Sequence, residues 1–159
     1  MDSRERAISK LLDRIPEESL VIASTGKIAR ELFELRVKRK EPTNDFYMMG
    51  SMGCAVPIGL GVALNTEKEV YVLTGDGALL MKLGSLATVG EQKNLHIIVL
   101  NNECHDSTGG QPTNFEEVKH FVREKCQVLD VEPGSRKDLG RPTITPKQMV
   151  KKFYAKVQA

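Results

Sequence analysis

Three short apolar runs, each bounded by polar residues and each followed by a helical pattern or a glycine-rich loop, constrain the fold most strongly. They are S-L-V-I-A-S at 19–24, E-V-Y-V-L-T at 69–74 and L-H-I-I-V-L at 95–100. Continuous apolar runs of this length are typical of strands buried on both faces, as in a parallel sheet. Because helical segments alternate with them, the sequence predicts an α/β fold of three layers, with a mainly parallel sheet covered by helices on both faces.

Other segments complete this pattern. Helices are predicted over the first dozen residues, from Gly26 onward, and over 55–64 and 78–91, and further strands over 46–49 and 126–131. Small residues in 55–64, among them Gly59 and Gly61, indicate a helix packed close to the sheet despite the low helix propensity of glycine.

Two helix starts are predicted from capping patterns. In T-N-F-E, Thr113 and Glu116 form a capping box, in which each side chain binds a backbone N–H that the first turn leaves free. Thr145, followed by Pro146, is predicted to cap the last helix, since proline is favoured in a first turn.

Composition limits the classes of function. The 159 residues, 40% of them apolar, fit one domain covering 1–159. With 23 basic and 21 acidic side chains the net charge is +2, so no global field favours nucleic acid or an anionic membrane as partner. The three cysteines are widely spaced, and no apolar stretch approaches the ~18 residues of a membrane helix. We therefore expect a cytoplasmic protein.

Two polar motifs end neighbouring predicted strands. G-D-G occupies 75–77 and N-N occupies 101–102. Each motif alone is also typical of an ordinary turn. At the carboxyl ends of parallel strands, however, Asp76 and Asn102 can lie side by side in the crevice where ligands of such sheets bind. Carboxylate and amide oxygens suit a hard cation such as Mg²⁺, which keeps part of its coordination shell for phosphate oxygens.

These motifs also carry a resemblance to a known family. The run G-D-G-A-L-L-M-K-L-G-S-L-A-T-V-G, followed by N-L-H-I-I-V-L-N-N, resembles the diphosphate-binding domain of thiamine diphosphate-dependent decarboxylases. Two further segments, G-S-M-G-C-A-V-P-I-G-L-G-V-A-L and C-H-D-S-T-G-G-Q-P-T, are similar more narrowly to the sulfopyruvate and phosphonopyruvate decarboxylases. The resemblance covers about residues 20–131.

The resemblance implies thiamine diphosphate and Mg²⁺ as cofactors and assigns their ligands. Asp76, the Asn102 side-chain oxygen and the Cys104 carbonyl would bind the metal. The other cofactor-binding positions that it implies are Thr25, Gly26, Gly50, Ser51, Met52, Gly75, Gly77, Ala78, Asp106 and Ser107. Cys104 departs from the small residue that is commonest at its position, which a backbone ligand tolerates.

Four side chains are assigned roles with an open alternative. Met52 would be the apolar wedge that holds the cofactor bent, or it fills the core. His105 would transfer a proton or pair with an anionic substrate group, or it is structural. Gln111 and Thr113 would donate hydrogen bonds to the substrate, or their loop is only a turn entering a helix.

The resemblance further implies a carboxy-lyase that converts an anionic 2-oxo acid to an aldehyde and CO₂. A separate chain of this length favours the beta subunit of sulfopyruvate decarboxylase, which forms sulfoacetaldehyde for coenzyme M biosynthesis. The alternatives are decarboxylation of phosphonopyruvate to phosphonoacetaldehyde, or a non-catalytic cofactor-binding module.

The activating glutamate of this superfamily lies in a different domain, and no residue of this chain matches that motif. The resemblance therefore implies an alpha-type partner with the pyrimidine-binding domain. We expect activity only in the resulting hetero-oligomer.

Overall fold

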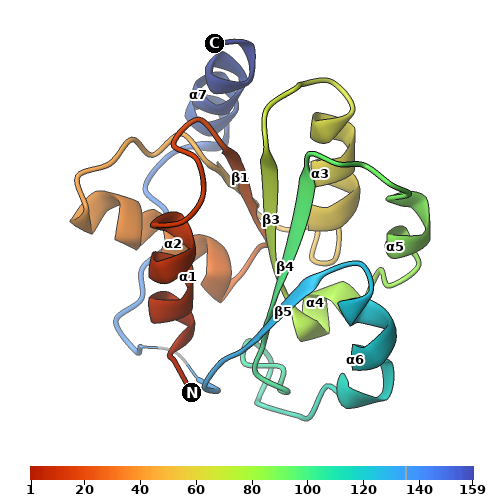
Figure 1. Ribbon diagram of the computed structural model, residues 1–159. Helices are drawn as coiled ribbons and strands as arrows, with labels where there is room; N and C mark the ends of the chain where they lie inside the picture. Colours follow the sequence, from red (N-terminus) through yellow and green to blue (C-terminus); the bar gives the residue numbers. More distant parts are fainter. Residues whose placement is uncertain (135) are drawn as a thin grey trace.

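A five-stranded sheet lies between two layers of helices in the computed structural model, which describes residues 1–134 and 136–159 (Figure 1). The strands are β1 (Leu20–Ala23), β2 (Phe46–Tyr47), β3 (Val70–Gly75), β4 (Leu95–Asn101) and β5 (Gln127–Asp130). Their order is β2-β1-β3-β4-β5, and every neighbouring pair is parallel. The predicted α/β class with a parallel sheet is confirmed.

The helices form one layer on each face of the sheet (Figure 1). One layer holds α1 (Arg4–Leu12) and α2 (Lys27–Lys38), and the other holds α3 (Ala55–Ala63), α4 (Asp76–Leu80), α5 (Ser85–Thr88) and α6 (Glu116–Arg123). The last helix, α7 (Pro146–Gln158), packs beside the edge strand β2. None of the described helices has both the length and the apolar character needed to cross a membrane.

Alternating side chains of the strands form a separate core on each face. In β1, Leu20 and Ile22 pack into the core on the α3 side, whereas Val21 and Ala23 pack into the core beneath α1 and α2. This is the alternation that the geometry of a strand imposes. Since both sets are fully buried, the continuous apolar runs of the sequence are explained by burial on both sides of the sheet.

Helix α3 approaches β3 closely at one of its two interior glycines. A Cβ atom added at Gly59 would lie 2.2 Å from Cγ2 of Val72, whereas one added at Gly61 would have no neighbour within 4 Å. The predicted close approach is therefore confirmed and depends on Gly59, while Gly61 faces outward.

The helix predicted over 78–91 is interrupted. Two short helices, α4 and α5, replace it, and α4 already begins at Asp76. Between them, Lys82 N donates to Leu79 O at 3.0 Å and Ser85 N donates to Lys82 O at 2.8 Å. These bonds span three residues, as in a 3₁₀ turn, and Gly84 within this segment lowers the helix propensity.

One of the two predicted helix caps is wrong. Helix α6 has Phe115 at its N-cap position and no side-chain cap, and the Thr113 hydroxyl donates to Asp76 instead. The other cap is confirmed, since Thr145 accepts from Gln148 N at 3.3 Å in a capping box that starts α7.

The two glycines of α3 give a matched pair of substitutions. We expect Gly59→Ala to lower the free energy of unfolding by about 1–3 kcal/mol, because the new methyl group meets the buried Val72. Gly61→Ala, which meets nothing, should raise it by about 0.5–1 kcal/mol through helix propensity. Urea denaturation of both variants measures this difference. Equal effects would contradict the close contact at Gly59.

Candidate functional site

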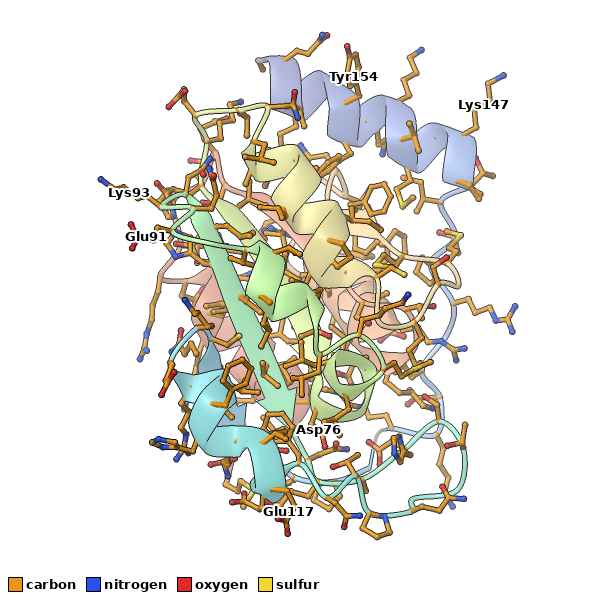
Figure 2. All side chains as sticks on the ribbon, turned by 90° about the vertical axis from the view of Figure 1, so that its right-hand side faces the viewer. Asp76, Glu91, Lys93, Glu117, Lys147 and Tyr154 are labelled. Atoms are coloured by element: carbon orange, nitrogen blue, oxygen red, sulfur yellow. The ribbon has the colours of Figure 1, made fainter. Side chains whose placement is uncertain are left out.

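Polar residues gather around a cleft of about 260 Å³ at the carboxyl ends of β1, β3 and β4. Figure 2 shows Asp76 at the end of the sheet opposite Glu91 and Lys93, which precede β4. The predicted site residues that line the cleft are Thr25, Met52, Gly75, Asp76, Gly77, Ala78, Asn102, Cys104, His105, Asp106 and Ser107. Two larger hollows, of about 650 and 670 Å³, contain none of the predicted residues, so we place the site at the smaller cleft.

The G-S-M-G segment lies at one side of this cleft. Gly26 and Gly50 line an adjoining hollow of about 340 Å³, and Thr25 lines both. Gly50 N donates to Thr25 Oγ1 at 3.0 Å, which ties the segment to the loop after β1. Ser51 is exposed and has a left-handed backbone, with φ of 56°.

Asp76 is held at one of its two carboxylate oxygens. It is buried at the start of α4, and its Oδ2 accepts a hydrogen bond of 2.6 Å from Thr113 Oγ1. In the described part of the chain, no hydrogen bond or ion pair engages Oδ1, which leaves this oxygen for a cation. Thr113, predicted to contact the substrate, is itself buried and orients Asp76. A contact of Thr113 with substrate stays a prediction.

Asn102 is held at the nitrogen end of its amide. Nδ2 donates to Asp106 Oδ2 at 2.7 Å. Because an ionised carboxylate only accepts hydrogen bonds, it fixes the NH₂ group on its own side and leaves the Asn102 oxygen for another partner. Among the residues that the structure describes, no hydrogen bond engages the Asn102 oxygen, so Asp76 and Asn102 each line the cleft with one free oxygen.

Cys104 lies in a tight loop that follows β4. The loop closes through an antiparallel bridge between Cys104 and Pro112, and His105 N donates to Gln111 O at 2.8 Å. Burial, with the hydrogen bond to Asp106, raises the pKa of the Cys104 thiol to about 11. The neutral thiol donates to Asp106 Oδ1 at 3.1 Å, so Cys104 does not present a thiolate. Its carbonyl accepts from Asp106 N at 3.1 Å and keeps a second lone pair.

His105 packs against the second glycine of G-D-G. A Cβ atom at Gly77 would lie 2.6 Å from His105 Nδ1, so this contact requires a glycine there. Within the described residues, no hydrogen bond engages the imidazole ring, and the ring lines the cleft. The catalytic and the structural interpretation both remain compatible with this position. Gln111, in contrast, is exposed on the loop and outside the cleft lining, and its contact with substrate stays a prediction.

Sequence reasoning missed Arg4, which lines the cleft, and Glu31, which lies behind it. Arg4 of α1 lines the cleft and binds both Glu31 of α2 and Asp106. Burial opposes ionisation of Asp106, but hydrogen bonds from Cys104 and Arg4 hold its pKa below the usual range. Helical spacing contained a signal, because Arg4 lies one turn before the apolar residues Ala7 and Ile8 and therefore shares their buried face.

The donor set of the cleft fits a hard cation and a phosphate group. The free oxygens of Asp76 and Asn102 and the Cys104 carbonyl are ligands that Mg²⁺ prefers. The hydroxyl of Ser24, which also lines the cleft, is buried and has no hydrogen-bond partner among the described residues. A buried hydroxyl in this position suits a ligand oxygen, since an unpaired one is costly.

Comparison with known proteins gives a family match and several similar decarboxylases. Residues 24–139 match the family described as thiamine pyrophosphate enzyme, C-terminal TPP binding domain. The phosphonopyruvate decarboxylase of Streptomyces viridochromogenes is 38% identical, with 96% of this chain and 46% of that protein aligned. Sulfopyruvate decarboxylase subunit beta is 40% identical in Methanocaldococcus jannaschii, over 70% of this chain and 61% of that protein. In Methanothermobacter thermautotrophicus it is 44% identical, over 71% and 60%.

A solved structure supports the fold. It is an X-ray structure of a candidate thiamin diphosphate-dependent enzyme from Mycobacterium smegmatis, with a TM-score of 0.55 and 16% sequence identity. The match covers 86% of this chain and 32% of that chain. This chain also spans only about half the length of the Streptomyces relative.

A comparison of Met52 with Met48, in the same loop region, tests whether Met52 serves the cleft or fills the core. Met52 is half-buried and lines the cleft, whereas Met48 belongs to the core at 4% exposure. We expect Met48→Ala to cost about 2–5 kcal/mol of stability and Met52→Ala much less, measured by thermal unfolding without ligands. A loss for Met52→Ala as large as that for Met48→Ala would show that Met52 fills the core.

Proposed function

Because this chain belongs to the thiamine pyrophosphate enzymes, among which it matches the C-terminal TPP-binding domain, we propose that it is the diphosphate- and magnesium-binding part of a 2-oxo acid decarboxylase. The observation that carries this proposal is the cleft in which Asp76 and Asn102 each keep one oxygen free. The names of the aligned relatives, phosphonopyruvate decarboxylase and sulfopyruvate decarboxylase subunit beta, support the reaction.

Different residues of the cleft would bind the metal and the diphosphate. Asp76, Asn102 and the Cys104 carbonyl would hold Mg²⁺, and the backbone of Gly77 and Ala78 would lie against the diphosphate. When bound, thiamine diphosphate supplies the electron sink for the loss of CO₂.

Two side chains on the cleft would act during the reaction. Met52 would support the bent cofactor from the side of the G-S-M-G segment. His105, whose ring lies beside Gly77, would move a proton or pair with the anionic group of the substrate.

The proposed active form contains a partner. Two observations support this proposal: the chain covers about half of the Streptomyces relative, and two of the aligned relatives are named as subunits. We assign the activating glutamate and the pyrimidine-binding domain to an alpha-type subunit. The site would then lie between chains of a cytoplasmic hetero-oligomer.

The proposed substrate is a small 2-oxo acid with a sulfonate or phosphonate group. The higher identity of 44% with a subunit beta favours sulfopyruvate, and hence a role in coenzyme M biosynthesis. The alignment over 96% of the chain with phosphonopyruvate decarboxylase favours the phosphonate as second candidate. Both groups are tetrahedral oxyanions, so the choice between them requires an assay.

The first test compares the chain alone with the chain and its partner. We expect the isolated chain, supplied with thiamine diphosphate and Mg²⁺, to release no CO₂ from sulfopyruvate or phosphonopyruvate, because we assign the activating glutamate to the partner. The reconstituted pair should release CO₂ from one of the two acids faster than from the other. Equal rates with and without the partner would contradict the divided site, and cofactor binding without turnover of any 2-oxo acid would favour the non-catalytic module.

The second test concerns the metal. Asp76→Ala removes a proposed ligand and leaves the Thr113 hydroxyl unpaired, so we expect a folded protein that is about 1–3 kcal/mol less stable. Calorimetry with the partner present should show Mg²⁺-dependent thiamine diphosphate binding at least about 10-fold weaker. Asp138→Ala, at an exposed site, is the control. Unchanged cofactor affinity in Asp76→Ala would remove Asp76 from the metal site.

A further inference from the structure

A buried arginine connects the first two helices to the loop after β4. Arg4 Nε lies 2.7 Å from Glu31 Oε2, and a second nitrogen lies 3.0 Å from Glu31 Oε1, so the two side chains form a bidentate pair. The remaining nitrogen of the guanidinium donates to Asp106 Oδ2 at 3.0 Å. The side chains of Arg4 and Glu31 are only 6% and 5% exposed.

Stability alone does not explain such a pair. Removing an arginine and a glutamate from water costs so much that a well-packed apolar pair of similar volume is often as stable or more stable. The arginine also reaches beyond its glutamate to a second carboxylate, on a loop 102 residues away in the sequence. The group that depends on Arg4 for its orientation is therefore Asp106.

Asp106 is fixed at both of its oxygens. Oδ2 accepts from Arg4 and, at 2.7 Å, from Asn102 Nδ2, while Oδ1 accepts from Cys104 Sγ at 3.1 Å. Gly134 N donates to the same carboxylate at 3.1 and 3.2 Å. A rotation of the carboxylate would break several of these bonds at once. The orientation of the Asn102 amide therefore depends on groups that Arg4 holds in place.

We propose that Arg4 and Glu31 are positioning residues of the metal site, which fix Asp106 and thereby keep the oxygen of Asn102 directed to the cation. This inference rests on the proposed function, since it assumes that the cleft binds Mg²⁺ with thiamine diphosphate. Arg4 lies outside the residues 24–139 that match the family, so helix α1 becomes part of the functional unit.

The alternative is that the ion pair of Arg4 and Glu31 only joins α1 to α2. In that case, removing the pair changes the stability of the fold and leaves the affinity for Mg²⁺ unchanged. A positioning pair predicts that metal affinity falls by more than the loss of stability can explain. Metal affinity and the order of the loop at 102–110 therefore separate the two.

The main variant is chosen so that Glu31 is not left as an unpaired buried charge. Arg4→Gln alone would leave Glu31 buried without its partner, so the main variant is the double substitution Arg4→Gln with Glu31→Gln. Arg4→Lys keeps the charge but loses the bidentate geometry. The control, Arg6→Gln, removes an arginine from the same helix. Its side chain is 70% exposed and, among the described residues, forms an ion pair only with Asp2.

Two measurements are made on each variant. Hydrogen exchange of the full chain without cofactor reports the order of residues 102–110 and is independent of the proposed function. Titration of Mg²⁺ in the presence of thiamine diphosphate and the partner subunit reports affinity. We expect faster exchange in the loop and roughly 10-fold weaker Mg²⁺ binding for the double variant, with a smaller loss for Arg4→Lys and no change for Arg6→Gln.

A third variant tests whether Arg4 acts on Asn102 through Asp106. Asp106→Asn should weaken Mg²⁺ binding, and its combination with the double variant should add little further loss, because both act on the same amide. Mg²⁺ affinity within about twofold of wild type in the double variant, or full additivity with Asp106→Asn, would overturn the inference. A wild-type chain that binds no thiamine diphosphate even with its partner would overturn the proposed function, and the inference with it.

Discussion

The parallel pairing of β3 with β4 is the constraint on which the site depends. Its register pairs Gly75 with Leu100, so β3 and β4 finish at the same end of the sheet. The chain leaves β3 at Asp76 and β4 at Asn102, and these two positions are offset by one residue. Burial on both faces fixes this register, because a slip of one residue would move every side chain of a strand to the opposite core. The apolar interior of the strands thus determines where two polar side chains meet.

Two of the three proposed metal ligands, Asp76 and Asn102, each have one polar atom held by a hydrogen bond and one oxygen free. Thr113 holds one oxygen of Asp76, and Asp106 holds the nitrogen of Asn102. Both holding residues belong to the loop region after β4, whose ends are joined by the bridge between Cys104 and Pro112. Since a carboxylate or amide left to rotate would lose orientation, these contacts preorganise the oxygens before any cation binds.

Sequence patterns predicted those parts of the protein that depend on residues close together in the chain. Apolar runs located β1, β3 and β4, and the motifs at their ends located the cleft. The capping box at Thr113 failed because its hydroxyl is taken by Asp76, which lies 37 residues earlier, and no local rule contains that contact. The pair of Arg4 and Glu31 was detectable only in part. Each charge lies on the buried stripe of its own helix, but their pairing depends on how α1 packs against α2.

Residues that precede the first strand and residues that follow the last strand support the same loop. Asp106 is held by Arg4 from the first helix and by Gly134 from the segment after β5, and Arg4 also donates to the Gly134 carbonyl at 3.2 Å. Without the Arg4 side chain, Glu31 would remain buried without its partner, a loss that costs about 3–5 kcal/mol where one member of a buried pair is removed. The first helix therefore contacts both α2 and the loop of the proposed site through the same guanidinium group. Arg4 thus connects the packing of α1 against α2 to the geometry of the cleft.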